Sequence, residues 1–146
     1  MKKILMSLLL CLSFACLKAQ TVNFYLVTGN TVYVQLDYQD SHGTYTSNVI
    51  AIPFYCGMPA YPVSFSSLTW VSGHPSSGGT FIDYIGYDGD PSCSGVNSVT
   101  VTPGNTLCIT SLSGCETFYN SCNAVTYTQL CFLWATGTNN LAINGG

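Results

Sequence analysis

Residues 31–38 read TVYVQLDY, and this stretch decides the fold class. Every second residue from position 32 is apolar, and these side chains share one side of an extended chain: Val32, Val34, Leu36 and Tyr38. The intervening side chains face the other way: Tyr33, Gln35 and Asp37. Alternation with a period of two is typical of a β-strand that buries one face. The stretch therefore predicts a strand with its first set of side chains in a core.

The same alternation recurs along most of the chain. We expect further strands at 22–27, 44–52, 63–71, 80–87, 96–102, 106–112 and 124–135. Within the last of these, Leu130 to Trp134 are apolar on both faces, which predicts an interior strand. No segment has convincing helical periodicity, and we expect at most a turn or two of helix near 114–121.

Two turn sequences predict hairpins. Gly29-Asn30 tolerates positive φ and would join 22–27 to 31–38, and Pro103-Gly104-Asn105 would join 96–102 to 106–112. About eight short antiparallel strands with frequent turns predict an all-β fold. We expect a disulfide-stapled β-sandwich, with a barrel as the alternative.

Residues 1–19 predict an export signal. Lys2 and Lys3 precede the apolar residues 4–16, and Leu17-Lys18-Ala19 is a suitable cleavage site. The apolar stretch is shorter than the roughly 20 residues of a transmembrane helix, and no later segment is long enough. A lipoprotein attached through Cys16 is the alternative. We expect residues 20–146 to form one secreted or cell-surface domain.

Six cysteines follow the predicted signal: Cys56, Cys93, Cys108, Cys115, Cys122 and Cys131. An even number in an exported domain predicts a disulfide framework. We expect Cys115 to pair with Cys122, Cys108 with Cys131, and Cys56 with Cys93. A zinc site is the alternative, but no C-x2-C pair is present.

The charge pattern excludes several partners. Every lysine lies in residues 1–18 and there is no arginine, so residues 20–146 carry six acidic groups and a formal charge of −6. Binding to a phosphate backbone or an anionic membrane requires basic side chains. We therefore expect no nucleic-acid partner.

Catalytic motifs are absent from the sequence: it has no G-x-S-x-G elbow, no H-E-x-x-H and no phosphate-binding loop. His42 and His74 lie in predicted loops, where an exposed histidine is the ordinary case. We expect a protein that is not an enzyme and needs no cofactor. An enzyme and a protease inhibitor are weaker alternatives.

Calcium is one ligand that the sequence allows. Asp88 and Asp90 flank a glycine in a predicted loop, and Asp83 lies on the strand before it. Clustered carboxylate oxygens bind calcium, although the full spacing of an EF-hand loop is missing. The alternative is an ordinary polar turn.

Aromatic residues make up 13% of the chain, and several stand beside polar residues. Sugars stack on flat aromatic faces and bond to amides and carboxylates. The candidate carbohydrate site comprises an acidic loop and nearby aromatic residues: Trp70, Tyr84, Tyr87, Asp88 and Asp90. Aromatic residues that only form cross-strand pairs are the alternative.

Charged residues make up only 6% of the chain, far below the roughly 25% of ordinary soluble domains. Strand edges and faces therefore lack the charges that normally prevent association. We expect a secreted structural or adhesive protein that associates with itself or with other extracellular proteins. The N-terminal strand is the candidate assembly element, through Val22, Phe24 and Leu26. A lectin-like module that binds glycans is the alternative function.

Overall fold

The computed structural model describes residues 20–26, 30–54, 57–120 and 122–146. The predicted export signal at 1–19, the alternative lipid site at Cys16 and the half-cystine at Cys56 lie outside the described residues. In the described part of the chain, no helix is both long and apolar enough to cross a membrane.

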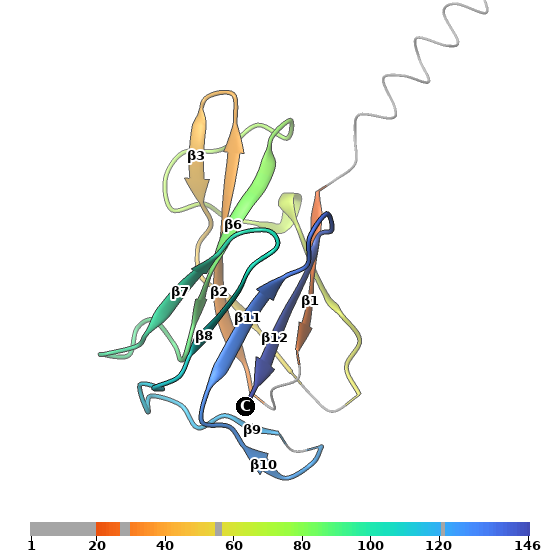
Figure 1. Ribbon diagram of the computed structural model, residues 1–146. Helices are drawn as coiled ribbons and strands as arrows, with labels where there is room; N and C mark the ends of the chain where they lie inside the picture. Colours follow the sequence, from red (N-terminus) through yellow and green to blue (C-terminus); the bar gives the residue numbers. More distant parts are fainter. Residues whose placement is uncertain (1–19, 27–29, 55–56, 121) are drawn as a thin grey trace, which may run out of the picture.

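Two five-stranded sheets form most of the fold (Figure 1). Sheet 1 has the order β5 (Tyr61–Ser64), β1 (Thr21–Leu26), β12 (Asn140–Gly145), β11 (Leu130–Trp134) and β8 (Thr106–Ile109). Sheet 2 has the order β3 (Gly43–Thr46), β2 (Val32–Asp40), β6 (Thr80–Tyr87) and β7 (Ser98–Val101), and β4 (Ile50–Ile52) also pairs with β2. A small third sheet contains β9 (Tyr119–Asn120) and β10 (Val125–Thr126), and a 3-10 turn, η1 (Phe65–Ser67), follows β5.

The core lies between the two large sheets, which confirms the predicted sandwich. Phe24 of β1 meets the ring of Tyr84 of β6 edge-on, and Tyr84 also contacts Phe132 of β11. The Tyr84 hydroxyl donates a hydrogen bond of 3.2 Å to the Leu133 carbonyl across the core. At Gly86 an added Cβ would lie 2.3 Å from the Phe132 ring, so only glycine allows the sheets to approach this closely. The described strands form two layers and no closed barrel.

Both predicted hairpins are wrong, because the two strands on either side of each turn sequence belong to different sheets. β1 pairs in parallel with β12 and antiparallel with β5, while β2 pairs with β3, β4 and β6. The turn before β8 does form: Gly104 has φ +87° and the Asn105 amide donates to the Thr102 carbonyl at 3.1 Å. However, β7 pairs with β6 and β8 pairs with β11. A turn sequence fixes a local reversal, but burial decides which sheet each strand joins.

The strand predictions were accurate where alternation was long. Residues 80–87 form β6 as predicted, and β11 is an interior strand between β12 and β8. The segments 44–52 and 124–135 are each divided between two shorter strands, and most of 63–71 is irregular. β12 was missed because only Leu141 and Ile143 mark its buried face. The region of possible helix near 114–121 contains no helix in its described residues, and β9 lies there instead.

Disulfides join neighbouring parts of the sandwich. Cys108 pairs with Cys131, as predicted, and the two residues lie directly opposite each other on β8 and β11. The predicted pairs Cys115–Cys122 and Cys56–Cys93 are wrong, because Cys93 pairs with Cys115. Cys122 is also disulfide-bonded. Proximity in sequence was misleading here, since the loops after β6 and β8 lie side by side in space.

Candidate functional site

The outward-facing side of sheet 2 carries a pair of tyrosines and a pair of carboxylates on neighbouring strands. We call it the tyrosine–aspartate face, and it consists of six half-buried residues on β2 and β6: Tyr33, Gln35, Asp37, Asp83, Ile85 and Tyr87. Strand pairing places them in three cross-strand rows: Tyr33 opposite Tyr87, Gln35 opposite Ile85, and Asp37 opposite Asp83. The face is thus an aromatic row at one end and a carboxylate row at the other.

A chain of hydrogen bonds fixes the aromatic row. The Tyr87 hydroxyl donates to the side-chain carbonyl of Gln35, and the Gln35 amide donates to the Ser47 carbonyl at 2.9 Å. Gln35 lies one row further along the sheet, so the Tyr87 ring lies along the sheet surface. Burial, and then the charge of Asp37, raise the pKa of Tyr87, so its hydroxyl stays protonated and can donate.

The carboxylate row holds two acids in contact. Burial raises the pKa of Asp83 to about 6, and the adjacent Asp37 carboxylate adds to this shift. The Oδ1 atoms of both residues are shielded from solvent and accept no hydrogen bond from the described residues. The register of β2 and β6 shifts between Asp37 and Tyr38, and such a β-bulge re-aims side chains. Asp83 therefore keeps its proton to a higher pH than an ordinary aspartate, because two adjacent carboxylates cannot easily both ionise.

Two further acids lie at the opposite, aromatic end. Burial, followed by the charges of Glu116 and Asp90, raises the pKa of Tyr33, and the side chain of Glu116 lies within hydrogen-bonding reach of Tyr33. Burial also raises the pKa of Glu116. The Ser92 amide donates to Asp90 at 2.9 Å and lowers the pKa of Asp90. Carboxyl groups therefore lie on both sides of the row formed by Tyr33 and Tyr87: Asp37 and Asp83 further along the two strands, and Glu116 and Asp90 in the loops beyond them.

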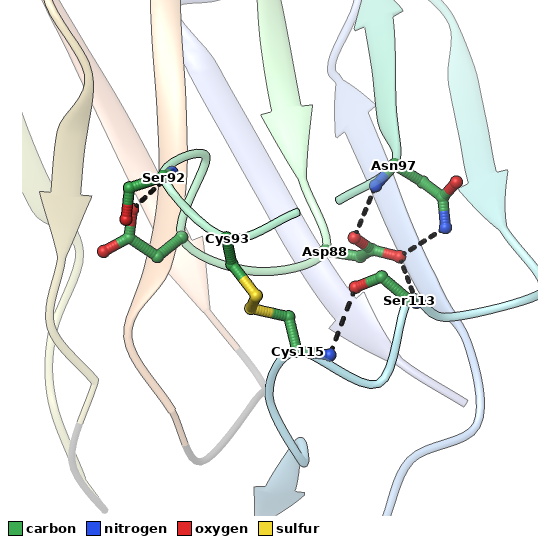
Figure 2. The surroundings of a disulfide bond; sticks show 7 residues. Asp88, Ser92, Cys93, Asn97, Ser113 and Cys115 are labelled. Carbon is green, nitrogen blue, oxygen red and sulfur yellow. Dashed lines mark hydrogen bonds between the residues drawn. A yellow bond between two sulfur atoms is a disulfide. The ribbon is translucent and has the colours of Figure 1, made fainter. Parts of the chain in front are cut away.

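The disulfide Cys93–Cys115 and the buried carboxylate of Asp88 hold these loops together (Figure 2). The Asn97 amide donates to Asp88 Oδ1 at 2.8 Å. The Asn97 side-chain amide and the Ser113 backbone amide donate to Asp88 Oδ2 at 2.8 and 2.7 Å. Asp88 thus joins the loop after β6 to the loop after β8, and its oxygens are occupied by the protein itself.

The predicted carbohydrate residues do not form one site. Tyr84 is fully buried in the core, and Trp70 packs against Tyr38 and Phe65. Asp88 is also fully buried. Of the five predicted residues, Tyr87 alone lies on the tyrosine–aspartate face, and Asp90 lies near the aromatic end of that face.

The predicted calcium ligands are also dispersed. Asp83 pairs with Asp37 on the sheet, Asp88 is buried between two loops, and Asp90 accepts from Ser92. In the described ranges, no group of three or more His, Cys, Asp or Glu side chains could hold a metal ion. The loop carboxylates are explained by their hydrogen bonds to the protein.

Sequence reasoning did not group Tyr33, Gln35, Asp37 and Glu116 into one site. The alternation in TVYVQLDY already places the first three on one side of a strand, so a search of the outward residues would have found them. Glu116 carries no such signal, because it is far from Tyr33 in the sequence and its neighbour Cys115 is bonded to Cys93 of another loop.

The outward-facing side of sheet 1 has a different composition. We call it the uncharged face, and strand pairing gives its members on β5, β1, β12, β11 and β8: Pro62, Ser64, Thr21, Asn23, Tyr25, Asn140, Ala142, Asn144, Cys131, Leu133, Thr106 and Cys108. Of the predicted assembly residues on β1, Val22 and Phe24 are buried in the core and Leu26 packs against it. Both sides of β1 are hydrogen-bonded to neighbouring strands.

Comparisons with protein-family models, with curated proteins and with solved structures found no match to this chain. Functional inference therefore rests on the chemistry of the two outer faces.

Proposed function

We propose that this protein is a secreted adhesive module that binds glycans on its tyrosine–aspartate face. The observation that carries the proposal is the Tyr87 ring, fixed along the sheet surface by its hydrogen bond to Gln35. A flat ring of this kind offers a stacking surface without a large loss of side-chain entropy on binding. The proposed role is binding without catalysis.

The polar groups around the rings support a polyhydroxylated ligand. Carboxyl groups accept hydrogen bonds from hydroxyls, and they stand at both ends of the tyrosine pair. Along β2, Tyr33 and Asp37 are four residues apart, which corresponds to about 13 Å. This length favours an oligosaccharide over a single sugar.

The disulfides support the proposed location. Cys93–Cys115 and Cys108–Cys131 are typical of proteins that fold in an oxidising compartment. Secretion to the cell exterior fits this chemistry and the predicted export signal. Glycans of a cell wall or a host surface are accessible there.

The test is a glycan array, followed by calorimetry with the oligosaccharides that bind. Tyr87→Ala should weaken binding at least about tenfold, because it removes a central aromatic contact. Tyr25→Ala is the matched control, since Tyr25 lies on the opposite face and is 46% exposed. Equal loss in both variants, or a wild-type protein that binds no glycan, would show that the proposal is wrong.

A further inference from the structure

The acidic residues are confined to one side of the molecule. Asp37, Asp40 and Asp83 belong to sheet 2, Asp88 and Asp90 to the loop after β6, and Glu116 to the loop beside Asp90. No strand of sheet 1 contains an acidic residue, and the lysines all precede residue 20. One broad face of the sandwich therefore has no charge at all.

From this segregation we infer that the uncharged face of sheet 1 is a self-association surface, and that its partner is a second copy of this chain. The inference does not depend on glycan binding, because the two faces are on opposite sides of the sandwich. It is based on the composition of the face, its area and the position of the charges.

The composition suits contact between identical surfaces. One row across the sheet consists of Tyr25, Ala142, Leu133 and Thr106. In the next row, the Asn23 amide donates to the Asn140 side-chain carbonyl at 3.4 Å. Amides and hydroxyls both donate and accept, so a two-fold pairing of this face with itself leaves no unmatched charge. Protein interfaces are enriched in Tyr and depleted in Lys, Glu and Asp.

The area of the face predicts a weak dimer. Five strands about 4.8 Å apart, with up to six residues of about 3.3 Å each, give roughly 480 Å² per copy. Two copies would bury roughly 1,000 Å², which is at the lower limit for a specific interface. Association should therefore depend on concentration.

The position of the charges favours this face over others. The two sheets of a sandwich pack about 10 Å apart, so Asp37 and Asp83 are separated from a dimer contact on sheet 1 by more than the Debye length of about 8 Å. Contact through sheet 2 would instead bring the carboxylates of both copies together. β1 is a poor route for strand exchange, since it is bonded to β5 and β12 within its own sheet.

Sedimentation velocity from about 1 μM to 1 mM tests the inference. The wild-type sedimentation coefficient should rise towards that of a dimer, and Ala142→Asp should weaken association at least about tenfold by placing a charge at the centre of the face. Thr100→Asp is the matched control: it adds the same charge to an exposed position on β7 of sheet 2 and should leave the dimer intact.

Asn144→Asp provides a second variant, because it adds a charge to an exposed position on the same face with little change in shape. Near-ultraviolet circular dichroism would establish that each variant is folded. A wild type that stays monomeric throughout would overturn the inference. Association that persists in both Ala142→Asp and Asn144→Asp, or that is lost equally in Thr100→Asp, would also overturn it. Glycan binding by the monomeric variants would separate this result from the proposed function.

Discussion

The two outer faces of the sandwich arise from the same pattern but differ in chemistry. Strands of both sheets alternate inward and outward residues, and the inward residues of both are apolar. Outward residues are Tyr, Gln, Ile and Asp on β2 and β6, but Thr, Asn, Tyr and Ala, with no charged residue, on β1 and β12. The core thus determines the fold, while residues that the core does not constrain give one face its paired tyrosines and carboxylates and leave the other neutral.

The two faces are also supported differently. On the uncharged face, Cys108–Cys131 links two neighbouring strands within sheet 1. Beside the tyrosine–aspartate face, Cys93–Cys115 links two loops, and Asp88 bonds to both of them. One disulfide therefore reinforces a regular sheet, while the other positions the irregular segments that carry Asp90 and Glu116.

Removing each disulfide should have similar effects on stability and different effects on the two faces. The bridges span 22 and 23 residues, so Cys93→Ser with Cys115→Ser, and Cys108→Ser with Cys131→Ser, should each lower the free energy of unfolding by about 3 kcal/mol. Urea denaturation measures this. Only the first pair should reduce glycan binding, and only the second should change self-association. The same functional loss in both variants would contradict the division between the faces.

Asp88→Ala tests the loop support without breaking a covalent bond. The change removes a buried carboxylate and leaves the part-buried amides of Asn97 and Ser113 without their acceptor, and we expect it to cost about 2 kcal/mol. Asp90→Ala is the control, because Asp90 accepts from the exposed Ser92. Hydrogen exchange should show faster opening of both loops in Asp88→Ala, while β11 and β12 remain protected. Slow exchange in the loops of this variant would show that Asp88 does not hold them.

Long alternation made the sandwich predictable. Thr80–Tyr87 and the stretch around TVYVQLDY form strands as expected, because burial of one face determines both. The sheet order could not be read from the sequence, since β1 and β12 pair in parallel although they are at opposite ends of the described chain. Local turn sequences contain no information on such a contact.

The site was predictable only in part. Tyr87 was predicted as a ligand residue, which stays a prediction, and it lies on the outward side of β6 as the alternation of that strand indicates. Asp88 looked like a typical loop carboxylate, and only the folded structure shows that two backbone amides and the Asn97 side chain saturate it. An Asp-Gly-Asp sequence does not distinguish a ligand site from a structural hydrogen-bond centre.

Asp83→Asn tests how the carboxylate row of the tyrosine–aspartate face makes the stability of the protein depend on pH. The pKa of Asp83 is raised to about 6 in the folded protein from 3.8, so its protonated form stabilises the fold fully below about pH 4, and this contribution is lost as the pH rises through 6. At pH 7.5 the variant should therefore be more stable than wild type by about 1 kcal/mol, after allowance for solvent screening. At pH 4 the two proteins should be equal.

Asp40→Asn is the control, because its effect on stability at pH 7.5 should be opposite in sign to that of Asp83→Asn. The Ser76 amide, with the amides of His42 and Gly43, lowers the pKa of Asp40 to about 2. Its stabilising contribution is present above about pH 4 and is lost as the pH falls through 2. Asp40→Asn should therefore destabilise the protein at pH 7.5. Thermal unfolding between pH 3 and 8 measures both variants. A stability difference between Asp83→Asn and wild type that does not change with pH would contradict the raised pKa of Asp83.

Tyr87→Phe should have the smallest effect on stability and the most specific effect on binding. It keeps the aromatic ring but removes the hydrogen bond to Gln35, which we expect to cost about 0.5 kcal/mol in the half-buried face. Because the ring is then no longer fixed along the sheet, glycan affinity should fall by a few fold, less than in Tyr87→Ala, and the entropy of binding should become less favourable. Tyr25→Phe, on the uncharged face, should change neither the affinity nor the entropy. Calorimetry with one oligosaccharide measures all three variants. If Tyr87→Phe binds as well as wild type while Tyr87→Ala does not, stacking alone carries the affinity and the hydrogen bond to Gln35 serves only the fold.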